Sequence, residues 1–159
     1  MPQSTRLLYD RAMTITPLLA EETRPLRSLV LRPGKPLTEV VYPGDDAAGT
    51  LHLGVRGDNG NVLAVASFFR EPWADLPETP GYRLRGMAVQ PDLRGTGIGR
   101  ALLLEGLERL CLDPAVELVW CNARVTAIGF YERLGFAVLG EPFLVPGTDI
   151  PHRIGVWRR

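Results

Sequence analysis

The chain is short of lysine, cysteine and histidine, and each shortage excludes a class of site. Lys35 is the only lysine, so the chain lacks the G-x-x-x-x-G-K-[ST] motif with which P-loop enzymes hold phosphates. The two cysteines, Cys111 and Cys121, make no disulfide framework, and together with two histidines they show no spacing typical of metal ligands. The sequence therefore predicts neither a P-loop nor a metal site.

The chain also lacks net charge and long apolar runs. Basic and acidic residues balance at 18 each, so we expect no field that attracts polyanions and no nucleic-acid partner. No apolar run approaches the ~20 residues that span a membrane, and the first residues show no apolar signal region. We expect a single domain over residues 1–159, soluble and cytoplasmic, with no membrane partner.

The most informative stretch that is present runs from Met87 to Leu104, MAVQPDLRGTGIGRALLL. A strand-like run ending at Val89 leads into a glycine-rich turn and then into an apolar-striped helix that continues to about Leu110. Glycines where a helix begins leave backbone N–H groups accessible at the positive end of the helix dipole. Arg94 and Arg100 add cationic donors, so this segment predicts a site for phosphate or pyrophosphate.

Two nucleotide-binding patterns remain for this loop. The dinucleotide fingerprint G-x-G-x-x-G meets Arg100 at its third glycine, although Glu117 lies near the distance expected for a ribose-binding acid. A nucleotide-dependent oxidoreductase therefore stays an alternative. The pattern [Q/R]-x-x-G-x-[G/A] fits at every position from Arg94 to Gly99.

A second segment, Cys121 to Phe136, reads CNARVTAIGFYERLGF. Four of its residues share one helix face at i, i+3, i+4 and i+7 spacing: Ala127, Ile128, Tyr131 and Leu134. Gly135 suits the left-handed position that ends a helix. Cys121, before this helix, is expected to be a buried structural cysteine and not a nucleophile.

The two segments together resemble the GCN5-related N-acetyltransferases (GNAT). The loop matches the coenzyme A loop of that family, and Ala127, Tyr131, Gly135 and Phe136 match its closing motif A-x-x-x-Y-x-x-x-G-F. The Ile-Pro-His ending at His152 is similar to the branch that includes the bacterial ElaA-like proteins. The resemblance implies an α/β (α+β) fold, with a mixed sheet of about seven strands, a splayed central pair, and about four flanking helices. It is good over residues 50–159, and the first fifty match in outline.

The resemblance also implies the chemistry. Acetyl-CoA would be the co-substrate, and its acetyl group would pass directly to a primary amine of a small molecule or peptide. Tyr131 matches the family's general acid, which protonates the departing thiolate. The residues implied to bind the coenzyme are Met87, Ala88, Val89, Arg94, Gly95, Thr96, Gly97, Ile98, Gly99, Arg100, Asn122, Ala127, Phe130 and Tyr131.

The chain departs from the family at two positions. Arg124 stands where the family has an asparagine that contacts the coenzyme arm; either Asn122 replaces it or the contact is absent. Arg83 and Arg85 occupy the strand where many relatives carry a glutamate base. This pair either binds a substrate carboxylate or forms an ordinary solvated face.

The general base is therefore open among Glu71, Glu141, His152 and a chain of water molecules. Each of these side chains has a plain surface role as its alternative. A non-catalytic domain that binds or senses acyl-CoA is a second possible function, and a homodimer is left open.

The remaining elements follow from local patterns. We expect a helix starting at Thr16-Pro17, with Thr16 as its N-cap, kinked or divided at Pro25 and ended by Pro33-Gly34. A long surface loop should cover 33–49, and His52 should face outward. The expected strands are Leu7–Thr14, Leu51–Val55, Val62–Phe69, Leu84–Val89, Val116–Cys121, Phe136–Gly140 and Arg153–Trp157, with a hairpin turn at 58–60 and a loop at 71–81.

Overall fold

A computed structural model describes residues 14–159. The described residues contain seven strands, three α-helices and three short 3₁₀ helices. In chain order these are β1 (Ile15–Pro17), α2 (Ala20–Leu31), η1 (Leu37–Val40), β2 (Leu51–Arg56), β3 (Val62–Arg70), β4 (Gly81–Val89), η2 (Pro91–Leu93), α3 (Ile98–Leu110), β5 (Leu118–Arg124), η3 (Val125–Ala127), α4 (Ile128–Arg133), β6 (Ala137–Leu144) and β7 (Pro151–Arg158). Seven strands match the prediction, and three α-helices compare with about four expected.

The chain divides into two compact units, and strands β3 and β4 pass through both. The first unit runs to Ser67 and resumes over Gly86–Gly106. The second comprises Phe68–Arg85 and Leu107–Arg159. The sheet order is β1-β2-β3-β4-β5-β7-β6, which is the mixed seven-stranded sheet implied by the resemblance.

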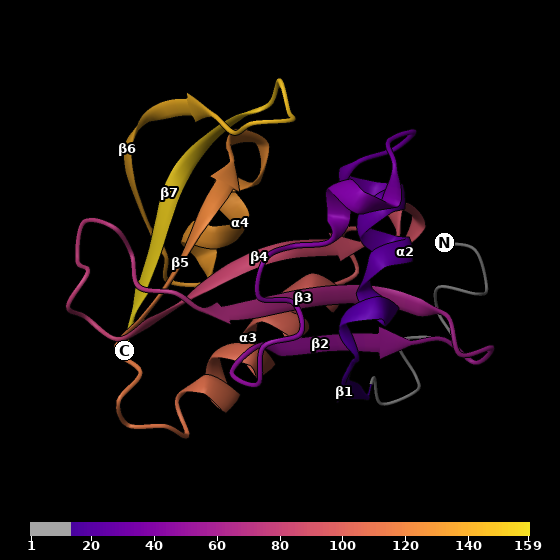
Figure 1. The fold of residues 1–159 in the computed structure, drawn as a ribbon, viewed down its shortest axis with the longest axis horizontal. Coiled ribbons are helices and arrows are strands. Elements are labelled where there is room, and N and C mark those ends of the chain that lie inside the picture. Colours follow the sequence, from indigo (N-terminus) through magenta and orange to yellow (C-terminus); the bar gives the residue numbers. More distant parts are fainter. Residues whose placement is uncertain (1–13) are drawn as a thin grey trace. The chain divides into compact units, whose positions relative to one another are not determined.

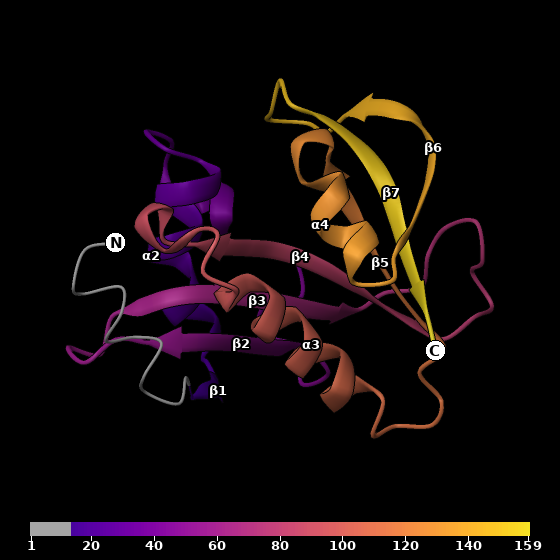
Figure 2. The same cartoon turned by 180° about the vertical axis from the view of Figure 1, so that it is seen from behind.

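In the first unit, strands β1 and β2 pair antiparallel, with Thr16 opposite Gly54. Helix α2 lies on one face of these strands and the greater part of α3 on the other (Figures 1 and 2). Leu18, Leu26, Val65 and Ala88 form a buried cluster of this unit. The core of the first unit therefore packs α2 against β3 and β4, which come from the two separate chain segments of this unit.

In the second unit, β5 pairs parallel with β4 on one side and antiparallel with β7 on the other. Helix α4 packs on one face of β5, β7 and β6 (Figure 2). Leu118, Trp120 and Val156 form a buried cluster, against which Trp73, Leu76 and Ile154 pack. The loop at 71–81, predicted correctly, thus covers part of this core.

The prediction for the start of the first helix was wrong. Thr16 belongs to β1, and α2 begins at Ala20 after Leu19. The Leu19 N–H donates to Glu22 Oε2 at 2.7 Å, so a carboxylate three residues into the helix satisfies this end. Helix α2 also continues undivided through Pro25. The strand predicted at Leu7–Thr14 falls almost wholly outside the described residues, and its last residue, Thr14, is not in a strand.

The segment 33–49 is less of a surface loop than predicted. It contains η1, and Val40, Tyr42 and Asp45 are buried. His52 is also buried, because β2 is covered on both faces along most of its length. Both corrections involve a buried polar cluster around Arg27, whose members lie far apart in the sequence.

Candidate active site

The glycine-rich segment Arg94–Gly99 lies in the first unit, where it leads into helix α3. The Ala101 N–H donates to Gly97 O at 3.0 Å, which is the first bond of helix α3. The amides of Ile98, Gly99 and Arg100 therefore have no acceptor within the helix. Thr96 Oγ1 donates to Leu93 O at 2.6 Å and tightens the turn before them. The result is a short exposed loop that presents backbone donors at the positive end of a helix.

The side chains of this loop differ in their exposure to solvent. Arg94 and Arg100 are exposed at its two ends, while Ile98 is buried and anchors the helix. Gly95 and Gly97 have φ angles of +75° and +87°, and a Cβ built on Gly95 would meet nothing within 4 Å. Two forked cations and a row of free amides suit a pyrophosphate group.

Strand β4 leads into this loop. Its register with β5 covers Gly81–Arg83 opposite Leu118–Trp120 and ends there, although β4 continues to Val89. Gly86 has a φ of +67°, so the strand bends immediately before Met87, Ala88 and Val89. The strand is longer than the predicted Leu84–Val89, and an isolated glycine in a strand pattern is the sequence signal for such a bend.

Helix α4 in the second unit carries Tyr131, which is 9% exposed. Its ring makes edge-to-face contacts with Phe130 and Phe136, at centroid distances of 5.1 and 5.4 Å. Burial is the main cause that raises the pKa of the Tyr131 hydroxyl far above its ordinary value; Cys121 adds a smaller rise, and the nearby Arg124 charge opposes it. The hydroxyl therefore keeps its proton throughout the neutral range.

The end of α4 confirms the predicted glycine stop. Gly135 has a φ of +88°, its N–H donates to Glu132 O at 3.1 Å, and the Phe136 N–H donates to Tyr131 O at 3.1 Å. This pair of bonds is the Schellman arrangement. Ala127 and Ile128 are half-buried, and Leu134 is buried with Tyr131, so the four residues share the predicted inward face.

Asn122 and Cys121 lie side by side on β5. Asn122 is half-buried opposite Ile154 of β7. Cys121 is 2% exposed, and desolvation raises the pKa of its thiol to about 12, so it is the inert buried cysteine that was predicted.

The structure brings together two of the candidates, Glu71 and Arg83. Arg83 Nη1 lies 3.4 Å from Glu71 Oε1, and its Cζ lies 4.9 Å from the centre of the Trp120 ring. The Trp120 indole N–H donates to Glu71 O at 2.9 Å. The Glu71 side chain remains 46% exposed, against 17% for Arg83. Arg83 therefore holds a carboxylate of its own chain, and Glu71 is a positioned acid and not an isolated surface group.

The other two base candidates lie on the last strands. His152 is 7% exposed on β7, opposite Arg124 of β5 and Phe143 of β6, so its plain surface alternative is wrong. Its ring centre is 6.3 Å from that of Phe143. Glu141 is exposed on β6, where the register with β7 is irregular. Arg85 is half-buried on β4.

Sequence reasoning gave no role to Trp120, Gly86 or Arg27. Trp120 fixes Glu71 and Arg83 through contacts distant in sequence, which no local pattern signals. Arg27 had a signal: it shares the buried face of α2 with Ala20 and Thr23, at i, i+3 and i+7 spacing. A charge on an apolar face indicates a buried partner elsewhere in the chain.

Comparison with known proteins agrees with this geometry. The model of the acetyltransferase (GNAT) family matches residues 18–136. An uncharacterized N-acetyltransferase of Bacillus subtilis, YitI, is 37% identical over 135 residues, covering 85% of this chain and 89% of that protein. An aminoglycoside N(6')-acetyltransferase type 1 of Stenotrophomonas maltophilia is 33% identical, covering 61% of this chain and 69% of that protein. Among solved structures, ElaA of Escherichia coli superposes with a TM-score of 0.74 at 18% identity, covering 92% of this chain and all of ElaA.

The chain therefore belongs to the GNAT family of acetyltransferases, as the two motifs indicated. It is an acetyltransferase enzyme, which disfavours both the non-catalytic domain and the nucleotide-dependent oxidoreductase. Among the described residues, no helix has the length and apolar character needed to cross a membrane.

Proposed function

We propose that this enzyme transfers the acetyl group of acetyl-CoA directly to a primary amine of a small molecule or peptide. The observation that carries the proposal is the loop Arg94–Gly99 at the start of α3, in a chain matched by the GNAT family over 18–136. The aminoglycoside-modifying relative supports an amine acceptor.

In the proposed reaction the coenzyme is held by backbone groups. The free amides at the start of α3, with Arg94 and Arg100, bind the pyrophosphate. The backbone of Met87–Val89, after the bend in β4, binds the pantetheine arm and the thioester oxygen. A backbone donor aimed at the developing oxyanion typically contributes ~3 kcal/mol to lowering the barrier.

The amine then attacks the thioester carbon, a C–N bond forms and the C–S bond breaks. Tyr131 donates a hydrogen bond to the departing sulfur, because burial keeps its hydroxyl protonated. A thiol has an ordinary pKa of about 8.5, so the more weakly acidic phenol stabilises the thiolate without surrendering its proton completely. The proton lost by the attacking amine passes to the base.

For that base we propose Glu71. Its carboxylate is exposed enough to meet an amine and is held in place by Arg83 and, through its backbone, by Trp120. The alternatives are His152, which is buried, and Glu141, which is exposed where the register of β6 with β7 is irregular. Glu71→Gln should lower kcat/KM by about 100-fold or more, whereas Glu141→Gln should leave kcat/KM unchanged. A kcat/KM lowered by His152→Gln and not by Glu71→Gln would assign the base to His152.

The coenzyme part of the proposal is tested by calorimetric titration with acetyl-CoA, with NAD and ATP as controls. We expect binding of acetyl-CoA alone, weakened roughly 10-fold in Arg94→Ala, since one charge-assisted contact is lost. Arg158→Ala, which removes an exposed arginine from the end of β7, is the charge-matched control and should bind normally. A folded protein that binds no acetyl-CoA would contradict the proposal.

A further inference from the structure

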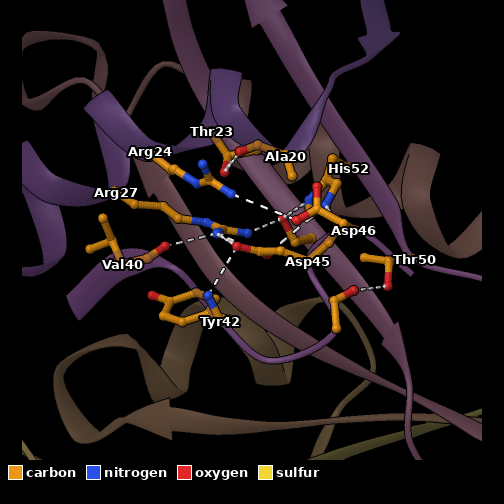
Figure 3. A network of polar contacts seen from close by, with 12 residues as sticks. Ala20, Thr23, Arg24, Arg27, Val40, Tyr42, Asp45, Asp46, Thr50 and His52 are labelled. Atoms are coloured by element: carbon orange, nitrogen blue, oxygen red, sulfur yellow. Dashed lines mark hydrogen bonds and ion pairs between the residues drawn. The ribbon is translucent and has the colours of Figure 1, made fainter. Parts of the chain in front are cut away.

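The first unit contains a buried cation that the proposed reaction does not use. Arg27 is the largest of the fully buried side chains, at 0% exposed. Its Nη1 donates to both carboxylate oxygens of Asp45 at 3.0 Å and to Val40 O at 3.1 Å (Figure 3). The Tyr42 N–H donates to the same carboxylate at 3.0 Å. The charge of Arg27 is thus balanced by a carboxylate from the segment between η1 and β2.

The other end of the cluster reaches two strands. Arg27 Nη2 donates to Ser67 Oγ at 2.8 Å, and Ser67 Oγ lies 2.6 Å from His52 Nδ1. His52 Nε2 lies 2.8 Å from Asp45 O. Because arginine has only donors and a carbonyl only accepts, a neutral imidazole here carries its hydrogen on Nε2, and Ser67 Oγ donates a hydrogen bond to Nδ1. These bonds form a closed ring of α2, the 40–45 segment, β2 and β3.

One side of this cluster presses on strand β4. A Cβ built on Gly86 would lie 2.7 Å from Arg27 Nε and 2.8 Å from Tyr42 Cε2. The Arg27 Cζ lies 4.4 Å from the centre of the Tyr42 ring, so guanidinium and ring are stacked beside the same glycine. Arg27 Nε is buried and has no hydrogen-bond partner among the described residues. The Arg27 Nε therefore lies beside Gly86 without a hydrogen bond among the described residues.

Gly86 is where β4 bends, at a φ of +67°. Glycine itself sets no preferred conformation, so neighbouring groups must select the bend. The buried pair of Arg27 and Asp45 can select this bend, because Arg27 cannot move without leaving a carboxylate uncompensated in the interior. The residues whose direction depends on the bend are the next three, Met87–Val89.

We infer that Arg27 is a positioning residue of the enzyme: held by Asp45 and stacked on Tyr42, it sets the bend at Gly86 and so aims the backbone of Met87–Val89. This inference rests on the proposed function, in which that backbone binds the thioester. Arg27 acts through Gly86 and does not touch the reacting atoms.

The first test compares Arg27→Lys with Ser67→Ala. Lysine keeps the charge beside Asp45 but removes the planar group packed against Gly86, so kcat should fall roughly 10- to 100-fold with acetyl-CoA affinity little changed. Ser67→Ala removes a bond on the opposite side of the cluster and should lower stability while leaving kcat unchanged. Equal kcat losses in both variants, or none in Arg27→Lys, would overturn the inference.

The second test does not depend on activity. Backbone amide exchange of residues 87–89 should accelerate in Arg27→Lys and not in Ser67→Ala. Gly86→Ala should reproduce the kcat loss, with the double variant losing less than the sum, and it carries the test alone if Arg27→Lys does not fold. If the unchanged protein binds no acetyl-CoA, the proposed function fails; if it binds but exchange at 87–89 ignores Arg27→Lys, only this inference fails.

Discussion

At the scale of single residues, burial decides the acid–base behaviour of the groups around α4. Tyr131 and Cys121 are both buried, and desolvation is the first cause of the raised pKa of each. A neutral phenol and a neutral thiol need no counter-ion in an apolar surrounding, whereas their anions would. The same environment thus preserves a hydrogen-bond donor at Tyr131 and suppresses nucleophilic chemistry at Cys121.

Tyr131→Phe should lower kcat roughly 100-fold or more and leave the dissociation constant of acetyl-CoA nearly unchanged, because the ring contacts remain. Since burial raises the pKa of Tyr131 above its ordinary 10.0, its protonated form persists through alkaline pH. The kcat profile of the unchanged protein should therefore show no alkaline decline from this group up to pH 10. Steady-state rates from pH 6 to 10 check this, and an unaltered kcat in Tyr131→Phe would remove Tyr131 from the mechanism.

The Cys121 thiol should make the fold sensitive to alkali. Its pKa is about 12 in the folded chain against an ordinary value of 9.0, so above pH 9 the unfolded chain releases a proton that the folded chain retains. The contribution of this thiol to the free energy of unfolding is fully present below pH 9. Above pH 9 the free energy of unfolding falls by up to about 1.4 kcal/mol per pH unit for this proton. Urea unfolding at pH 8 and pH 10 should show a smaller loss in Cys121→Ala. The half-buried Cys111 provides the control: Cys111→Ala should keep the full loss.

At the scale of elements, local chemistry chose the ends of the two motif helices. Helix α3 begins directly after the glycine loop, and α4 ends at a left-handed glycine. Both boundaries were predicted because each depends on residues within one turn of the helix end. The start of α2 was mispredicted because Thr16 pairs with Gly54 in the sheet, and that partner lies far from Thr16 in the sequence.

Two glycines of the α4 region should respond to alanine with opposite signs. Gly135→Ala places a Cβ at a φ of +88° and should destabilise the protein by about 1–2 kcal/mol, although the new Cβ would meet nothing closer than 3.6 Å. Gly129 lies inside the helix with ordinary φ, and Gly129→Ala should stabilise it by up to about 1 kcal/mol. Chemical denaturation measures both, and changes of the same sign would show that α4 ends differently.

At the scale of the whole molecule, each of the two units contains one of the two family motifs. The loop at 94–100 lies in the first unit, and Asn122 and Tyr131 lie in the second. All three tryptophans, Trp73, Trp120 and Trp157, lie in the second unit.

Acetyl-CoA should raise the thermal unfolding midpoint of the protein, measured both by tryptophan fluorescence and by circular dichroism. A ligand at 100 times its dissociation constant adds about 2.7 kcal/mol to the free energy of unfolding of the protein that binds it. NAD should leave both midpoints in place. Midpoints that acetyl-CoA leaves in place would contradict its proposed role as co-substrate.

The sequence by itself determined the family, the seven-stranded fold and the two motif helices of this enzyme. Their signals are short runs, Arg94–Gly99 and Ala127–Phe136, in which hydrogen bonding and φ angles depend on near neighbours. Only the tertiary structure decided the burial of His52, the pairing of Glu71 with Arg83, and the contact of Arg27 with Gly86. In each of these cases a polar side chain has at least one partner 12 or more residues away, and such partners meet only when the sheet is assembled.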